Sequence, residues 1–162
     1  MDNSQTDNRA CGECTSCCDG WLHAVIYGHE MGNGVPCQFR KPAACGIYET
    51  RPELCRSFRC GWLMPGSGFP EAWRPDKAGF IIRPGTWRGG KCWLLHPAPQ
   101  DPGEEVLAFM RQHTIATGEP HIIVKKGSWL CYGKPEFQQA MVEFRRTEHP
   151  GAELKVNFLQ KS

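Results

Sequence analysis

Cysteines in the N-terminal third are the side chains whose type and spacing point most directly to chemistry. Four of them lie within eight residues, in the pattern CxxCxxCC from Cys11 to Cys18. Two residues between cysteines allow one turn of the chain to direct both sulfur atoms towards a single metal ion. Thiolates are soft ligands that select zinc, copper(I) or iron–sulfur clusters over magnesium or calcium. The pattern therefore predicts a metal-binding segment.

Further cysteines follow in a segment that is rich in turns. Together with the first cluster they supply eight thiols, enough for two four-cysteine sites or for one cluster with thiols to spare. The adjacent Cys17 and Cys18 point in different directions in most backbone conformations, so they can serve different metals. Spacing alone does not pair the cysteines. The predicted metal ligands are Cys11, Cys14, Cys17, Cys18, Cys37, Cys45, Cys55 and Cys60.

The arrangement of these cysteines resembles that of a known family. The cluster at residues 11–18, the lone Cys37 and the string C-x-I-Y-x-x-R-P-x-x-C-R-x-F-x-C at residues 45–60 are similar to the YkgJ-like CxxCxxCC family. That family is described as a zinc- or iron-chelating domain, and the resemblance covers residues 11–60. It implies chelation of metal by the eight cysteines. The family includes flagellin lysine N-methylases, but no S-adenosylmethionine-binding motif is recognisable here, so no enzymatic activity is carried over.

Zinc or iron is therefore the expected cofactor, with an iron–sulfur cluster as one form of iron. Closed four-thiolate zinc sites are structural rather than catalytic, so we expect a metal-binding protein with a structural or accessory metal, and not an enzyme. The alternative is an iron–sulfur enzyme or redox protein related to the lysine N-methylases. CxxCxxC resembles the opening of a bacterial ferredoxin motif, although no cysteine in this chain precedes a proline.

Composition and the first residues predict a cytoplasmic protein. Residues 1–8 are polar and acidic, without the basic start and apolar core of a secretory signal. No apolar run approaches the roughly 20 residues that span a bilayer, so no membrane is expected as a partner. In a reducing compartment, clustered thiols serve metals or redox chemistry more often than disulfides. Disulfides remain the alternative, because the compartment rule has exceptions.

A basic central stretch raises a further alternative, a zinc-stabilised nucleic-acid-binding module. Residues 40–91 carry ten basic and four acidic side chains, and tryptophans between arginines can stack on single-stranded bases. Tryptophans more often fill the core of a small domain, so nucleic acid is not expected as a partner, and a protein partner is left open. We expect Trp21 and Trp62 to cover the metal site. Cys92 and Cys131 are expected in the core as small apolar side chains.

Other side chains near the cysteines have two interpretations each. Two four-thiolate zinc sites would each carry about two negative charges, which Arg51 and Arg56 can offset; a solvated helix face is the alternative. His23 and His29 follow the first cluster, and either could replace a cysteine ligand. The short paired spacing of zinc-binding histidines is missing, however.

Short elements and turns have to position these residues, and the expected fold class is α+β in one small domain. We expect residues 9–63 to form the cysteine region and residues 64–162 the α+β part, with the boundary in the Pro/Gly-rich stretch 64–70. A capping box from Thr50 to Glu53 predicts a helix that carries Cys55. A later helix is expected to begin at 101–104 and to end at Gly118, with one face formed by Val106, Leu107, Met110, Thr114 and Ile115. Strands are expected at 21–28, 78–83, 91–96, 121–125 and 128–132, and a last helix at 135–146.

Overall fold

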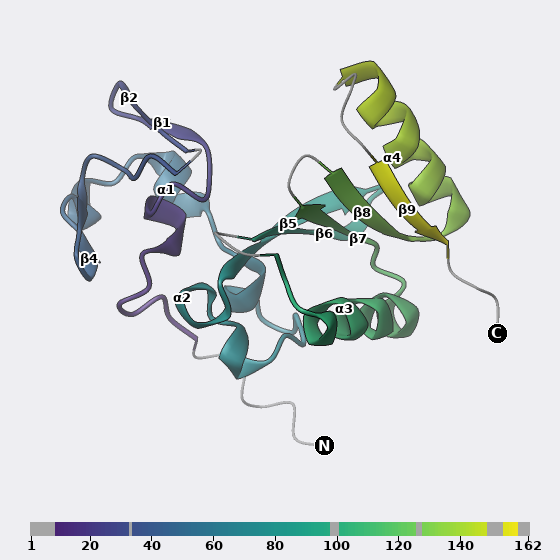
Figure 1. Cartoon of the computed structure of the whole chain (residues 1–162). Helices are drawn as coiled ribbons and strands as arrows, with labels where there is room; N and C mark the ends of the chain where they lie inside the picture. Colours follow the sequence, from purple (N-terminus) through teal and green to yellow (C-terminus); the bar gives the residue numbers. More distant parts are fainter. Residues whose placement is uncertain (1–8, 33, 98–100, 126–127, 149–153, 159–162) are drawn as a thin grey trace. The chain divides into compact units, whose positions relative to one another are not determined.

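Two compact units make up the chain in the computed structural model, which describes residues 9–32, 34–97, 101–125, 128–148 and 154–158. The division falls between Ile81 and Ile82. Four α-helices and three β-sheets occur in the described residues, so the α+β fold class is confirmed. Figure 1 shows the loops and short hairpins of the first unit and the sheet and helices of the second. None of the described helices is long and apolar enough to cross a membrane.

The first unit is built from very short elements separated by turns. β1 (Ala24–Ile26) pairs with β2 (His29–Met31), and β3 (Arg40–Lys41) pairs with β4 (Ala44–Cys45), each pair antiparallel. Tyr27 and Gly28 have φ angles of 48° and 84°, as a two-residue type I′ turn requires. The helical turns are η1 (Ser16–Cys18), η2 (Tyr48–Thr50), α1 (Glu53–Ser57), η3 (Gly61–Leu63), η4 (Glu71–Trp73) and α2 (Pro75–Ala78).

The helix that carries Cys55 is present, but the predicted capping box is wrong. α1 begins after Pro52, and no side chain caps it. Arg51 precedes a proline and is held in an extended conformation with ψ 140°, since the proline ring disfavours helical geometry there. Thr50 therefore ends η2, and its hydroxyl donates a hydrogen bond to the carbonyl of Ile47 (3.4 Å). The strand expected at 21–28 is also shorter, confined to β1.

A small apolar cluster holds the first unit together. Cys60, Trp62 and Ile81 are buried in it, and several half-buried side chains pack around them: Cys17, Trp21, Leu22, Phe58, Leu63 and Trp73. Arg9 ties this cluster to the next segment, because its guanidinium donates to the carbonyls of Trp62 (2.9 Å) and Phe69 (2.8 Å). Residues beyond the Pro/Gly-rich stretch thus complete this core.

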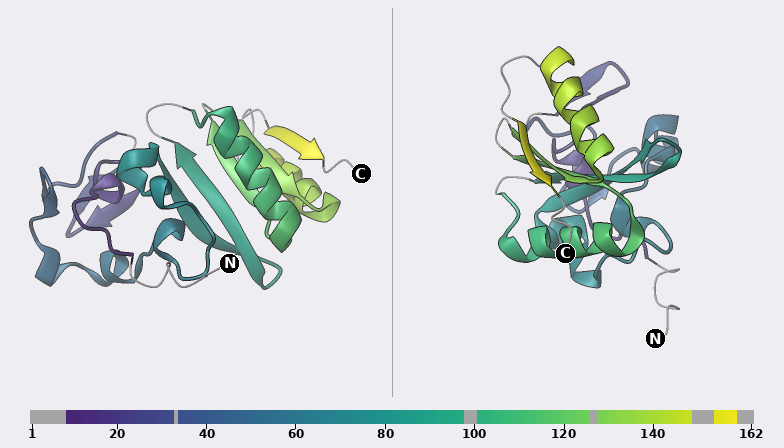
Figure 2. Two further views of the ribbon diagram at one scale, coloured as in Figure 1. Left: turned by 90° about the horizontal axis from the view of Figure 1, so that it is seen from below. Right: turned by 90° about the vertical axis from the view of Figure 1, so that its right-hand side faces the viewer.

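The second unit is a sheet with one helix on each face. Its strand order is β5 (Phe80–Trp87), β6 (Gly90–Pro97), β7 (His121–Lys125), β8 (Ser128–Gly133) and β9 (Leu154–Phe158). α3 (Glu104–Thr117) joins the parallel pair β6 and β7, and α4 (Pro135–Glu148) joins the parallel pair β8 and β9. β7 and β8 are antiparallel, so two right-handed crossovers put the helices on opposite faces, as Figure 2 shows.

Each face of this sheet has its own buried side chains. On one face, Phe137 of α4 packs with Ile122 and Cys131 of the sheet, and further side chains pack against them: Trp87, Cys92, Leu94, Trp129 and Met141. The alternate positions Trp93 and Leu95 face the other way and are fully buried, as is Met110 of α3. The core role predicted for Cys131 is confirmed, and Cys92 is half-buried against the same cluster. All six tryptophans of the chain are buried or half-buried.

Three details of the second unit differ from expectation. β5 continues through Pro84, which an edge strand tolerates, and the turn to β6 falls at Arg88 and Gly89 (φ 47° and 79°). Ile115 is 58% exposed, whereas Met110 and Thr114 of the same predicted face are buried; the hydroxyl of Thr114 donates a hydrogen bond to the carbonyl of Glu119 (2.8 Å). β9 was not predicted, although alternating apolar and polar residues at 154–158 are a strand signal.

Candidate metal centre

The first CxxC forms a hydrogen-bonded turn. The backbone N–H of Cys14 donates to the carbonyl of Cys11 (2.9 Å), and Gly12 takes the left-handed φ of 55° that this turn needs. The Cys11 side chain is exposed, and Cys14 is half-buried. The Cys14 thiol donates weakly to the hydroxyl of Ser16 (3.5 Å). Two potential ligands therefore stand at the ends of one turn, as the spacing predicts.

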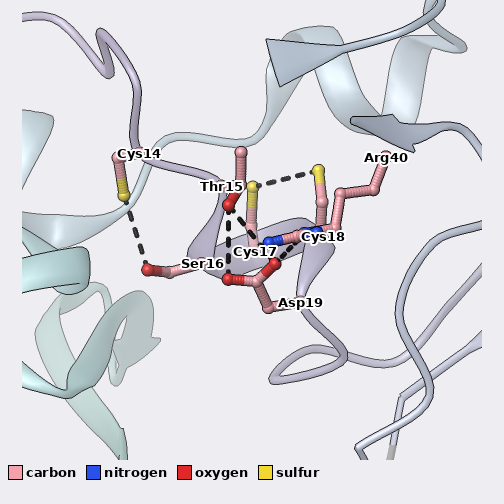
Figure 3. A network of polar contacts seen from close by, with 7 residues as sticks. All are labelled: Cys14, Thr15, Ser16, Cys17, Cys18, Asp19 and Arg40. Carbon is pink, nitrogen blue, oxygen red and sulfur yellow. Dashed lines mark hydrogen bonds and ion pairs between the residues drawn. The ribbon is translucent and has the colours of Figure 1, made fainter. Parts of the chain in front are cut away.

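Cys17 and Cys18 form a close pair in η1. Their Sγ atoms are 3.8 Å apart, and Figure 3 shows them side by side, with Cys14 turned away towards Ser16. The hydrogen bond from the Cys17 thiol lowers the pKa of Cys18 to about 7, and the same bond raises the pKa of Cys17. The pair therefore gives up one proton readily and holds the other.

Cys37 reaches this pair because two chain segments approach closely. Its backbone N–H donates to the carbonyl of Cys18 (2.8 Å). Gly20 makes the approach possible: its φ is 88°, and a Cβ there would lie 2.7 Å from the carbonyl oxygen of Val35. The N–H of Arg40 donates to the carbonyl of Cys37 (3.1 Å), and Arg40 pairs with Cys45 across β3 and β4. One run of backbone contacts thus links Cys18, Cys37 and Cys45.

Cys55 and Cys60 interact with different thiols. Burial raises the pKa of Cys55, and the thiols of Cys18, Cys37 and Cys45 raise it further. Burial also raises the pKa of Cys60, and there Cys11 and Cys14 are the thiols that add to the effect. The backbone N–H groups of Leu63 and Trp62 act in the opposite direction on Cys60, because hydrogen bonds to sulfur stabilise a thiolate.

All eight predicted ligands lie in the first unit, but their sulfur atoms do not converge on one point. As the side chains lie, no three His, Cys, Asp or Glu residues in the described part of the chain could hold a metal ion together. All ten cysteines are free thiols. The donor set still fits a thiophilic metal in its chemistry, and the neighbouring thiols would have to move towards an ion and lose protons to bind it.

Arg51 lies where its positive charge acts on two of the thiols. Arg51 lowers the pKa of both Cys18 and Cys55. Its Nε donates to the carbonyl of Tyr48 (2.9 Å), and its guanidinium carbon lies 3.7 Å from the centre of the Tyr48 ring. Arg51 therefore lies near enough to Cys18 and Cys55 to favour their thiolate forms, whereas Arg56 is exposed on α1.

Arg40 is a site residue that the sequence analysis did not single out. It forms an ion pair with Asp19 and lowers the pKa of Cys18 (Figure 3). No local signal marks it, because the pairing of β3 with β4 and the approach at Gly20 create its position. Of the two candidate histidines, the exposed His29 packs edge-on against Phe39, with ring centres 5.8 Å apart.

The comparisons with known proteins add no relative. The chain matches no family model, no curated protein and no solved structure. The properties of the candidate centre follow from its own thiols, their burial and the two arginines beside them.

Proposed function

We propose that the chain is a metal-binding protein of the CxxCxxCC type whose thiols hold zinc or iron in a structural or accessory role. The observation that supports this is the gathering of thiols from separate segments in one unit. Six of the eight are half-buried. The proposed ligands are Cys11, Cys14, Cys17, Cys18, Cys37, Cys45, Cys55 and Cys60.

The electrostatics of the thiols support a cation among them. Burial raises the pKa of Cys11, and the neighbouring Cys14 and Cys18 raise it further; Cys55 shows the same pattern. Without a cation, thiolates at these positions repel one another, so the thiols keep their protons. A divalent ion would replace those protons and turn the repulsion into attraction.

The binding free energy of a structural metal ion is as large as the net stability of a whole domain. Structural zinc contributes roughly 10–16 kcal/mol of apparent binding free energy in small peptides, compared with a net stability of about 5–15 kcal/mol for a whole domain. Metal in the first unit would therefore decide whether its loops fold. The ten free thiols also support a reducing compartment, and we propose the cytoplasm.

An iron–sulfur protein is the second candidate, because the CxxCxxC spacing also suits cluster ligation. Purification of the full chain with and without oxygen, followed by elemental analysis and an assay for acid-labile sulfide, separates the two. We expect a colourless protein with about two zinc ions per chain. A brown protein with sulfide would favour the cluster. A folded protein free of metal, with eight thiols open to titration, would contradict both. Cys131→Ser is the matched control and keeps its metal.

A further inference from the structure

We infer that the second unit binds a small organic carboxylate with an apolar body, in a cavity between α3 and the sheet. The cavity has a volume of about 270 Å³, close to the lower end of the range for small-molecule sites. Its lining side chains come from α3, β7 and β8, all of which belong to the second unit. Ligand binding there would not require the metal proposed for the first unit.

One face of α3 forms a wall of this cavity. Glu104, Leu107 and Arg111 line it, and their spacing of three and four residues places them along one face of a helix. The following Thr114 contacts Nδ1 of His121, at the start of β7, through its hydroxyl (2.7 Å). α3 therefore runs opposite to β7, with Arg111 near the start of that strand and Glu104 towards its end.

Alternate side chains of β7 and β8 form the facing wall. His121 pairs with Tyr132, and Ile123 pairs with Leu130. A step of two residues along a strand returns to the same face of the sheet, so these two pairs and Lys125 all line the cavity. The intervening residues pack on the other side of the sheet, with α4, so α4 does not close the cavity.

The end of the cavity at the start of β7 is positively charged. Burial, with smaller contributions from His113 and Arg111, lowers the pKa of His121 to about 3, so its imidazole is neutral at pH 7 and the guanidinium supplies the charge. Arg111 forms no ion pair with any residue that the structure describes. The His121 ring stacks on that of Tyr132, with centres 5.4 Å apart, and the Tyr132 hydroxyl is a further donor. A planar guanidinium binds a carboxylate through two parallel hydrogen bonds.

The rest of the cavity is apolar in the middle and carries offsetting charges at its far end. Leu107 of α3 lines the middle together with Ile123 and Leu130 of the sheet. Glu104 and Lys125 line the end towards which β7 runs, and there their opposite charges offset each other. A ligand therefore meets one positive end, an apolar middle and a far end without net charge.

This order of side chains favours a carboxylate with an apolar body over other small molecules. Inorganic phosphate or sulfate could meet Arg111 but would leave the apolar side chains in contact with water. A hydrocarbon could fill the middle but would place no charge against the guanidinium. A carboxylate whose alkyl chain extends from Arg111 towards Leu130 satisfies both, since two residues of a strand span only about 7 Å.

Hexanoate, added to the full chain and followed by calorimetry and NMR, tests the site. We expect a dissociation constant below about 1 mM, with the largest amide shifts in β7, β8 and the second half of α3. 1-Hexanol keeps the alkyl chain without the charge, and acetate keeps the charge without the chain; each should bind at least about tenfold more weakly. Absence of hexanoate binding, shifts elsewhere in the chain, or equal binding of 1-hexanol would overturn the assignment.

Two exposed arginines provide a matched pair of variants. Arg111→Gln removes the proposed partner of the carboxylate from an exposed position and should weaken hexanoate binding at least about tenfold. Arg146→Gln changes an arginine of α4 whose side chain is 74% exposed, and should leave the affinity unchanged. Leu130→Phe should fill the middle of the cavity and abolish binding; if that variant does not fold, the arginine pair decides. Equal affinities of the two glutamine variants would overturn the role of the cavity.

Discussion

Each of the two units of this chain is stabilised by a different kind of internal packing. The second unit has strands of five to eight residues and two helices of 14 residues, and these bury apolar side chains on both faces of one sheet. The first unit has hairpins of two or three residues per strand, which are too short to be stable without further packing. Its apolar cluster is small.

Cysteine makes the contrast visible, because both units contain it. Cys131 is fully buried in the second unit and acts there as a small apolar side chain. In the first unit most cysteines are half-buried and have other thiols as neighbours. A cysteine that is fully buried therefore serves as an apolar core residue in the second unit. Half-buried cysteines with other thiols nearby are the proposed metal ligands in the first unit.

Removal of the metal should produce the largest difference in stability between the two units. The first unit should unfold when a chelator strips the full chain, since it would lose a contribution on the order of 10 kcal/mol, while the second unit should stay folded. Hydrogen exchange measures both at once: amides of β1 to β4 should lose protection, and those of β6 to β8 should keep it. Retained protection in the first unit after complete removal of metal would show that its apolar cluster suffices.

The converse experiment weakens the second unit. Phe137 is 2% exposed, and its ring meets that of Trp87 edge-on with centres 5.4 Å apart. Phe137→Ala should cost about 3–5 kcal/mol of unfolding free energy in that unit and leave the metal content unchanged. Phe144→Ala, at a position of α4 that is 43% exposed, is the control and should cost less than about 1.5 kcal/mol. Loss of metal from the Phe137 variant would mean that the units depend on each other.

The close backbone contact between Gly20 and Val35 can be tested within the first unit. Gly20→Ala would place a methyl group 2.7 Å from the carbonyl oxygen of Val35, at φ 88°, so the segment that carries Cys37 would be pushed away from Cys18. We expect a loss of about 2–3 kcal/mol and weaker binding of one metal in calorimetric titration. Gly28→Ala has nearly the same φ (84°) with nothing within 4 Å. This control should show only the backbone strain, about 1–2 kcal/mol, and equal metal affinity of both variants would contradict the role of Gly20.

The cysteine pattern and the strand patterns were readable from the sequence because both depend on local order. Three of the four expected strands of the second unit lie where alternation and β-branched residues put them, and the CxxC spacing implies the turn at Cys11. Which cysteines become neighbours was not readable, because it depends on contacts between distant segments. Cys37 reaches Cys18 only through the approach at Gly20, and Arg40 becomes a site residue only through a strand pair of two residues.

The failed local predictions have the same origin. Thr50 has the residue type of a helix cap, but Pro52 holds Arg51 extended and moves the start of α1. Ile115 has the spacing of a buried side chain but is exposed at the edge of the predicted face, whereas Thr114 on that face is buried, with its hydroxyl hydrogen-bonded to Glu119 and His121.

Acid should affect the second unit through His121. The hydroxyl of Thr114 already donates to the carbonyl of Glu119 (2.8 Å), so in its 2.7 Å contact with Nδ1 of His121 the ring nitrogen is the donor. Burial lowers the pKa of His121 to about 3, with smaller contributions from His113 and Arg111. In the unfolded chain the pKa of His121 is about 6.5, so below that pH the unfolded state binds more protons than the folded state.

Stability of the second unit should therefore fall as the pH falls from about 6 to 4, by about 1.4 kcal/mol per pH unit from this one group. Hydrogen exchange at β7 measures it, because the first unit loses metal over the same range and would obscure a global unfolding curve. His121→Gln is the comparison and should flatten the dependence. An imidazole of His121 that NMR finds protonated at pH 5 in the folded chain would contradict the argument.

The smallest expected effect concerns reactivity rather than stability. Burial raises the pKa of Cys92 to about 11, so at pH 7.5 its thiolate fraction should be roughly 300-fold lower than that of an ordinary thiol. In the chelator-treated chain, iodoacetamide should therefore modify the eight cysteines of the first unit and spare Cys92 and Cys131, and denaturant should make all ten react. Modification of Cys92 together with the first eight would mean that the sheet opens when metal leaves. The independence of the two units would then have to be abandoned, because the enclosed thiols of one would depend on the ligands of the other.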